Sequence, residues 1–158
     1  MTTRRQVLRK SGSQTPIRNQ QTPEGVFNTW NGFSVQPKPG DCSLLLSHLR
    51  TVVCSGDVNL YEWVLDWAAD CVQDPGELKG TAIVMRGKEG TGQGTFANTL
   101  GRLFGPHYVH LIDTNHLMGN FNAHLMEAIV VFADEITWGG NVKNQGKLKG
   151  LVTEPQLT

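Results

Sequence analysis

The most constraining feature of the chain is an apolar run that leads directly into a glycine-rich run. Residues 81–85, with the sequence TAIVM, are bounded by glycines, which is typical of a central strand buried in a parallel sheet. The residues that follow, 86–96, read RGKEGTGQGTF. A helix is predicted from Thr95 to Phe104, where a Gly-Pro pair ends it. This succession of strand, loop and helix is the start of an α/β unit.

Two further apolar runs predict two more strands, at 108–112 and at 128–133. Strands that follow a loop and a helix in this way indicate a central, mostly parallel sheet. The predicted fold class is therefore α/β.

A small helical segment is predicted to precede the sheet. Apolar residues recur at helical spacing over 41–53 and again over 58–73. The second helix carries two apolar rows, so it is expected to be covered on most sides. Trp63 and Trp67 belong to one of these rows and are expected to lie in the core.

The distribution of charge divides the chain into a tail and a body. The sequence has 14 basic and 14 acidic residues, but residues 1–23 contain five basic residues and no acidic residue. Residues 1–25 are therefore expected to be a disordered basic tail or linker, either solvated or in contact with nucleic acid phosphates. Residues 26–78 are expected to form an irregular lead-in and the helical subdomain, and residues 79–158 to form the core with the sheet.

The cysteines and histidines favour no metal site. The 3 cysteines lack a C-x-x-C spacing, which indicates reduced thiols rather than a disulfide framework or a zinc site. His107, His110, His116 and His124 have no partner cysteines or close carboxylate pattern, so structural roles are expected for them.

Neither a membrane span nor a secretion signal is evident. No apolar run reaches the length of a membrane-spanning helix, and no apolar segment of the secretory kind follows the basic N-terminus. The chain is therefore expected to be soluble and cytoplasmic, with no membrane partner.

The glycine-rich run indicates a phosphate-binding loop, because such a turn between a strand and a helix aims backbone N–H groups and the helix dipole at one point. The general pattern G-x-x-x-x-G-K-[ST] is kept at Gly87 and Gly92 but is broken by Gln93 and Gly94. Glutamine cannot neutralise phosphate charge as lysine does, so nucleotide binding is expected to be more secure than hydrolysis. The residues expected to bind the nucleotide are Gly87, Gly90, Thr91, Gly92, Gln93, Gly94 and Thr95.

Two acidic residues follow the strand predicted at 128–133. This strand would carry Asp134 and Glu135 to the edge where open α/β sheets bind ligands. Asp134 is expected to hold Mg²⁺, usually through water, because that ion prefers oxygen ligands and keeps several waters. Glu135 is expected to orient or deprotonate an attacking water. Both residues are therefore candidate catalytic groups, with solvated carboxylates at a strand end as the alternative.

Several short blocks occur in order along the chain, WNGF at 30–33, PKPGDC at 37–42, GTGQGTF at 90–96, GRLFG at 101–105, HLMGNFNAHL at 116–125, FADE at 132–135 and TEP at 153–155. Together they resemble the helicase domain of phage and virus primase-helicases, within the superfamily III helicases of the AAA+ class of P-loop NTPases. The resemblance implies an AAA+-like P-loop fold that binds ATP and Mg²⁺. By this resemblance, the glycine-rich loop corresponds to the Walker A element of the family, and Asp134 with Glu135 corresponds to the Walker B element. Gln93 stands where the family usually has lysine, which puts ATP hydrolysis in doubt.

The resemblance also implies partners. In related helicases the region after Walker B faces a DNA channel, so Lys143, Lys147 and Lys149 are candidate DNA contacts, with a solvated basic helix face as the alternative. A homo-oligomeric ring and a primase or polymerase part in a longer protein are implied as well. The family's sensor residue and arginine finger would follow Thr158, so the chain resembles an N-terminal, truncated part of the motor.

Two other functions remain open on the sequence. One is a non-catalytic module that keeps the fold to bind nucleotide, DNA or a ring partner, which Gln93 favours. The other is a nucleoside monophosphate kinase, whose loops also place glycine before threonine. Those kinases carry the loop near the start of the chain and need an arginine-rich lid, whereas here only Arg102 follows the loop.

Overall fold

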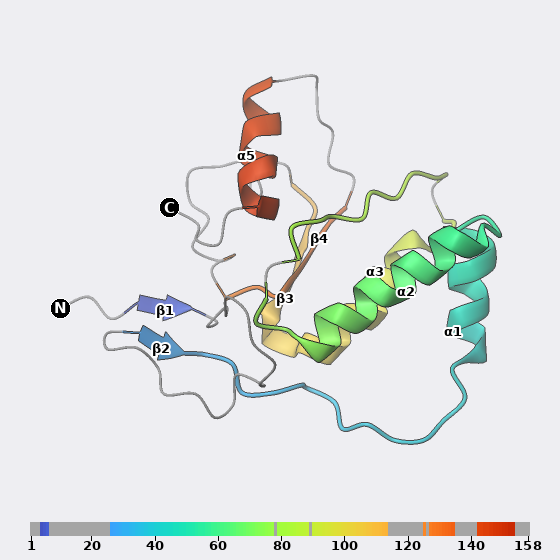
Figure 1. Ribbon diagram of the computed structural model, residues 1–158, viewed down its shortest axis with the longest axis horizontal. Helices are drawn as coiled ribbons and strands as arrows, with labels where there is room; N and C mark the ends of the chain where they lie inside the picture. Colours follow the sequence, from blue (N-terminus) through green and yellow to red (C-terminus); the bar gives the residue numbers. More distant parts are fainter. Residues whose placement is uncertain are drawn as a thin grey trace.

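The computed structural model describes residues 4–6, 26–77, 79–88, 90–113, 125, 127–134 and 142–153. These residues form a mixed α/β structure of helices and two small two-stranded parallel sheets (Figure 1). No helix within these ranges is long and apolar enough to cross a membrane. Of the segment 1–25, only β1 (Arg4–Gln6) is described, and it pairs in parallel with β2 (Val26–Asn28).

The first predicted helix is confirmed as two consecutive segments. Helix α1 (Ser43–His48) continues directly into a π-helical segment, η2 (Leu49–Val53). The Asp41 carboxylate accepts hydrogen bonds from the Ser43 N–H at 2.8 Å and from the Ser43 hydroxyl at 3.0 Å, at the start of α1. These bonds favour the charged carboxylate and lower the pKa of Asp41.

The second predicted helix is α2 (Val58–Gln73), with the bounds expected from the sequence. The Asp57 side chain caps it by accepting a hydrogen bond from the Leu60 N–H at 3.0 Å. The expectation of cover on most sides is wrong, because Trp63 is 46% exposed and only Val64 and Cys71 are buried. Two apolar rows therefore do not place both faces of this helix in the core.

The core gathers around α3 (Gln93–Phe104), which begins two residues before the predicted start. Phe104 is fully buried, and Trp30 lies against it with ring centroids 6.4 Å apart. The short 3₁₀ turn η3 (Gly105–His107) follows, and the buried His107 donates from Nδ1 to the Glu127 carbonyl oxygen at 2.7 Å. The buried members of this core are Trp30, Leu49, Cys54, Val64, Cys71, Phe96, Leu100, Phe104 and Val130.

The sheet consists of β3 (Tyr108–Leu111) and β4 (Val130–Ala133), paired in parallel with Tyr108 opposite Val130. Alternate residues face opposite sides, as strand geometry requires. Tyr108 and Val130 pack toward the core that contains α3, whereas residues 109, 111 and 133 pack toward α5 (Val142–Thr153). Helices α3 and α5 therefore cover opposite faces of the sheet (Figure 1).

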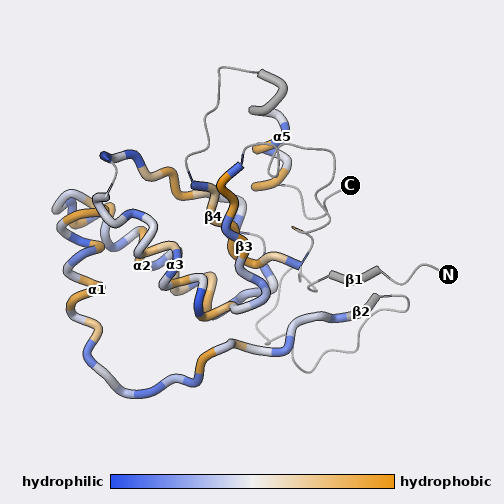
Figure 2. Tube along the Cα trace, turned by 180° about the vertical axis from the view of Figure 1, so that it is seen from behind, coloured by the Kyte–Doolittle hydropathy of each residue, from blue (hydrophilic) through white to orange (hydrophobic). Residues whose placement is uncertain are grey.

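The strand predicted at 81–85 is not formed. Residues 81–88 run as an extended segment that joins neither described sheet, and Val84 is 85% exposed. Figure 2 shows the apolar residues of this segment as an orange stretch that leads toward β4. Ile83 and Met85 still pack against the core. The segment is therefore buried on one side only, whereas the pattern predicted burial on both sides. The described sheet is correspondingly smaller than the central sheet expected from the sequence.

Candidate functional site

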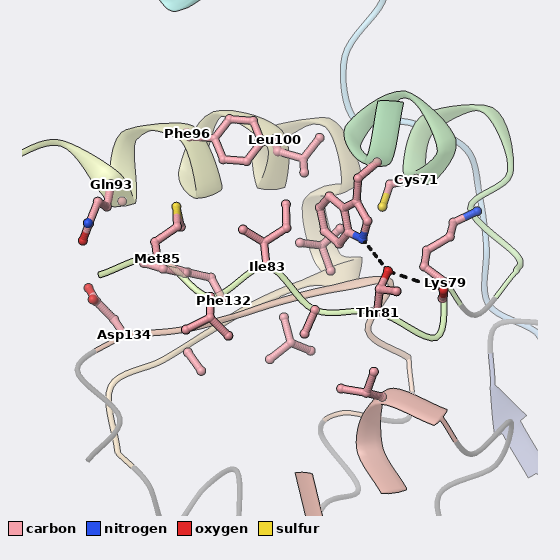
Figure 3. A pocket seen from close by; sticks show the side chains of 18 of the residues that line it. Cys71, Lys79, Thr81, Ile83, Met85, Gln93, Phe96, Leu100, Phe132 and Asp134 are labelled. Atoms are coloured by element: carbon pink, nitrogen blue, oxygen red, sulfur yellow. Dashed lines mark hydrogen bonds between the residues drawn. The ribbon is translucent and has the colours of Figure 1, made fainter. Parts of the chain in front are cut away.

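A pocket of about 1040 Å³ lies between segment 79–88, β4 and helices α3 and α5. Figure 3 shows Gln93 and Asp134 at one end of this pocket, with Met85 and Ile83 pointing toward Phe96 and Leu100 of α3. The pocket brings together Asp134 and every residue expected to bind the nucleotide, although these come from separate parts of the chain. Cys71, Lys79 and Thr81 lie at the opposite end (Figure 3).

The start of segment 79–88 is tied to α2. Lys79 Nζ lies 3.0 Å from Asp70 Oδ2 and donates a hydrogen bond to the Asp74 carbonyl oxygen at 2.8 Å. The Trp67 indole N–H donates to the Thr81 hydroxyl at 3.2 Å (Figure 3). These contacts hold the N-terminal end of segment 79–88, which leads into the loop, against α2.

The glycine-rich loop turns sharply before α3. Gly90 has φ +76° and Gly92 has φ +79°, conformations that side chains rarely adopt. The Thr91 hydroxyl donates to the Lys88 carbonyl oxygen at 2.8 Å and closes the turn that contains Gly90. Gly92 is the N-cap of α3, so no side chain caps this helix. Its first N–H groups have no intrahelical partner, which makes this end of the helix attractive to an anion.

The Gln93 side chain folds back over the loop. A Cβ at Gly87 would collide with the Gln93 amide nitrogen and would lie 3.1 Å from the Thr91 hydroxyl. Only glycine therefore fits at position 87 as long as the Gln93 side chain keeps this conformation. The side chain that stands at the lysine position of the motif thus lies against the loop backbone with an uncharged amide.

Gly94 has a looser environment than Gly87. A Cβ at Gly94 would lie 3.5 Å from the Asn98 amide nitrogen and 3.7 Å from the Phe132 ring, which are ordinary contact distances. The Thr95 N–H donates to the Gly92 carbonyl oxygen at 3.0 Å. A hydroxyl-bearing residue is therefore compatible with position 94, next to Thr95.

Asp134 directly follows β4, at the carboxyl end of the strand. Its N–H donates to the Leu111 carbonyl oxygen at 2.8 Å, which fixes its backbone against β3. Its Oδ2 lies 3.5 Å from Nε2 of His110, whose ring lies 4.7 Å from the Phe132 ring, centroid to centroid. Burial raises the pKa of Tyr108, and the negative charge of Asp134 raises it further. Asp134 is thus a half-exposed carboxylate with one histidine beside it.

The chemistry of this donor set fits a magnesium ion bound with a nucleotide. Mg²⁺ is usually held by one or two carboxylates together with substrate phosphates and water. Asp134 supplies such a carboxylate in the pocket that contains the loop. Among the described residues no group of three or more His, Cys, Asp or Glu side chains gathers, so a protein-only metal cage is not formed there.

The structure describes the remaining predicted residues only in part. Glu135 lies outside the described residues, as do His116 and His124. Lys143, Lys147 and Lys149 lie on α5, on the other face of the sheet from α3, but the side chain of Lys143 is not described. The pocket is lined by other α5 residues, Leu148, Leu151 and Val152.

Sequence reasoning missed His48, which the structure places against the loop. His48 Nε2 lies 3.0 Å from the Gly92 carbonyl oxygen, across 44 residues of sequence. No local pattern signals such a contact, because His48 otherwise completes an ordinary short helix. The same holds for His110, which was expected to be structural and lies beside Asp134.

Residues 85–158 match a family model described as a family of unknown function, DUF5906. The matched segment begins at Met85 and contains the loop, α3, the sheet, Asp134 and α5. No curated protein and no solved structure matches the chain significantly. The similarity thus covers the part of the pocket that is formed by residues from Met85 onward.

Proposed function

We propose that this chain is an ATP-binding domain of the helicase type, from a DNA replication protein of the phage or viral primase-helicase class. One observation carries the proposal. The glycine-rich loop, the uncapped start of α3 and the carboxylate of Asp134 all line a single pocket. A nucleotide phosphate chain with its metal is the ligand that such a combination suits.

In this proposal the loop holds the phosphates. The N–H groups of Gln93 and Gly94, with the positive end of the α3 dipole, bind phosphate oxygens. Asp134 holds Mg²⁺, usually through water, and the ion when bound supplies charge neutralisation at the β- and γ-phosphates. Glu135 orients or deprotonates the attacking water. Asp134 and Glu135 are thereby the catalytic pair.

Gln93 weakens hydrolysis in this proposal more than binding. A preorganised charged group at a transferring phosphoryl group contributes on the order of 10²–10³ in rate. The Gln93 amide donates hydrogen bonds but carries no charge, and it lies against Gly87. The backbone donors that bind phosphate do not depend on this side chain.

The wider assembly follows from the family resemblance. The core is proposed to have the AAA+ P-loop fold, to form a homo-oligomeric ring, and to act with a primase or polymerase part in the host cytoplasm. Lys143, Lys147 and Lys149 are proposed to contact DNA phosphates without sequence preference. Half-burial of Lys147 and exposure of Lys149 are compatible with that role.

A non-catalytic module is the second candidate, and the position of Gln93 favours it. Its amide lies over the part of the loop next to Gly87, and the Asp134 carboxylate lies beside His110. A domain with these features would hold a nucleotide or a ring partner without turning ATP over.

The experiment that separates these outcomes is calorimetric titration of Mg-ATP into the wild-type chain and into Gln93→Lys. The matched control is Gln73→Lys, which makes the same change in charge at the exposed end of α2. The proposal predicts that the wild type binds, that Gln93→Lys binds severalfold more tightly and gains ATPase activity, and that Gln73→Lys equals the wild type. Binding without any gain in hydrolysis favours the non-catalytic module, and absence of binding in all three contradicts the proposal.

A further inference from the structure

The loop is held from outside by one histidine. Among the described residues, His48 is the one side chain from outside segment 86–95 that hydrogen-bonds to this segment. Its Nε2 lies 3.0 Å from the Gly92 carbonyl oxygen. A carbonyl oxygen only accepts hydrogen bonds, so Nε2 carries the proton and donates it. The same oxygen accepts from the Thr95 N–H at 3.0 Å, which uses its second lone pair.

The histidine ring also packs directly on Gly92. A Cβ at Gly92 would lie 2.7 Å from His48 Cε1, closer than real contacts allow, and 3.0 Å from Nε2, which is tighter than most real contacts. Gly92 also has φ +79°, so two independent reasons require glycine there. His48 is half-buried and precedes the almost fully buried Leu49.

The bond to Gly92 controls where the first helical N–H group points. The C=O of Gly92 and the N–H of Gln93 belong to one planar trans peptide, so they point in opposite directions. When His48 and Thr95 hold the carbonyl oxygen on the helix side, the Gln93 N–H points away from the helix, toward the loop. The Gly94 N–H follows in the same turn and is equally free of an intrahelical partner.

We propose that His48 is the positioning residue of the phosphate loop. It fixes the Gly92–Gln93 peptide so that the Gln93 and Gly94 N–H groups converge on a bound phosphate. This inference rests on the proposed function, since it assigns His48 a part in phosphate binding at that same site. Helix α3 has no side-chain cap. His48, which belongs to α1, restrains the first turn of α3 in place of a cap.

The test compares three ligands and three variants by calorimetry. The ligands are Mg-ATP, Mg-tripolyphosphate and adenosine, which separate phosphate recognition from base recognition. His48→Phe keeps an aromatic ring but has no donor, His48→Gln keeps an N–H donor, and Ser47→Ala is the neighbouring exposed control. Loss of one hydrogen bond corresponds to about a threefold to tenfold loss of affinity.

The expected result is an equal loss of affinity for Mg-ATP and Mg-tripolyphosphate in His48→Phe, with adenosine unaffected. His48→Gln should recover part of the loss, and Ser47→Ala should equal the wild type. Wild-type affinity in His48→Phe overturns this inference alone. An equal loss for adenosine overturns the positioning role in favour of general destabilisation. No binding of either phosphate ligand by the wild type overturns the proposed function and this inference together.

A measurement on the wild type serves if His48→Phe does not fold. The proton on His48 Nε2 gives its own signal in nuclear magnetic resonance, and its exchange with water reports the bond to Gly92. Coupling between the bond and phosphate binding predicts slower exchange when Mg-tripolyphosphate is bound. Unchanged exchange at saturating Mg-tripolyphosphate overturns the inference.

Discussion

Strand β4 has two different neighbours. It pairs with β3 through four residue pairs, and the sheet that they form lies between helices α3 and α5. Segment 79–88, in contrast, is extended but joins neither described sheet, and it lines the same pocket as β4. No strand ladder of the described sheets therefore leads into the loop, which is continuous with α3 and is hydrogen-bonded to His48.

The paired side should carry most of the stability. Phe104 is 0% exposed at the centre of the core, so Phe104→Ala is expected to lower the free energy of unfolding by about 3–5 kcal/mol. Urea unfolding followed by circular dichroism measures this loss. A loss below about 1 kcal/mol would mean that the core around α3 is not the main stabilising element.

Two glycines of α3 give a matched comparison along one helix. A Cβ at Gly101 would lie 2.5 Å from the Tyr108 ring, whereas a Cβ at Gly94 would make only ordinary contacts. Gly101→Ala is therefore expected to cost about 1–3 kcal/mol, as overpacking does. Gly94→Ala should be neutral or stabilising by up to about 1 kcal/mol, since alanine favours helices. Equal effects in thermal unfolding would contradict the close approach of α3 to β3.

Stability should also depend on pH through a cysteine of the pocket. Burial raises the pKa of Cys71 from 9.0 to about 11. The unfolded thiol loses its proton near 9.0, so between these values the folded state binds more protons and its stability falls as pH rises. Unfolding titrations at pH 8.5 and 10.5 should show a smaller decline in Cys71→Ala than in the wild type. Identical declines in the two chains would place the Cys71 thiol in a water-accessible environment.

The open side of β4 should be the least sensitive. Val84 is 85% exposed on the unpaired segment, so Val84→Ala is expected to change the free energy of unfolding by no more than about 0.5 kcal/mol. The same urea titration measures it. A loss above about 1.5 kcal/mol would show that Val84 is covered in solution.

The sequence predicted the helices better than their surroundings. Apolar spacing predicted the bounds of α2, because this signal is local. The exposure of Trp63 and the unpaired state of residues 81–85 depend on which elements pack alongside, which no local pattern contains. Apolar residues in a short run indicate burial but not hydrogen-bonded pairing.

The candidate site shows the same division. The glycine pattern and the position of Asp134 after a strand predicted that both would lie near one ligand, and both do line one pocket. The Gln93 amide over Gly87 and the His48 bond to Gly92 could not be predicted, because they depend on side-chain conformation and on a contact across 44 residues.

The most direct test of the phosphate site is to add Mg-ATP to the ¹⁵N-labelled wild-type chain and follow each backbone amide by nuclear magnetic resonance. The account predicts saturable shifts at Gly92, Gln93, Gly94 and Asp134. A spectrum that stays unchanged at millimolar Mg-ATP, or that shifts only at α5, would contradict it.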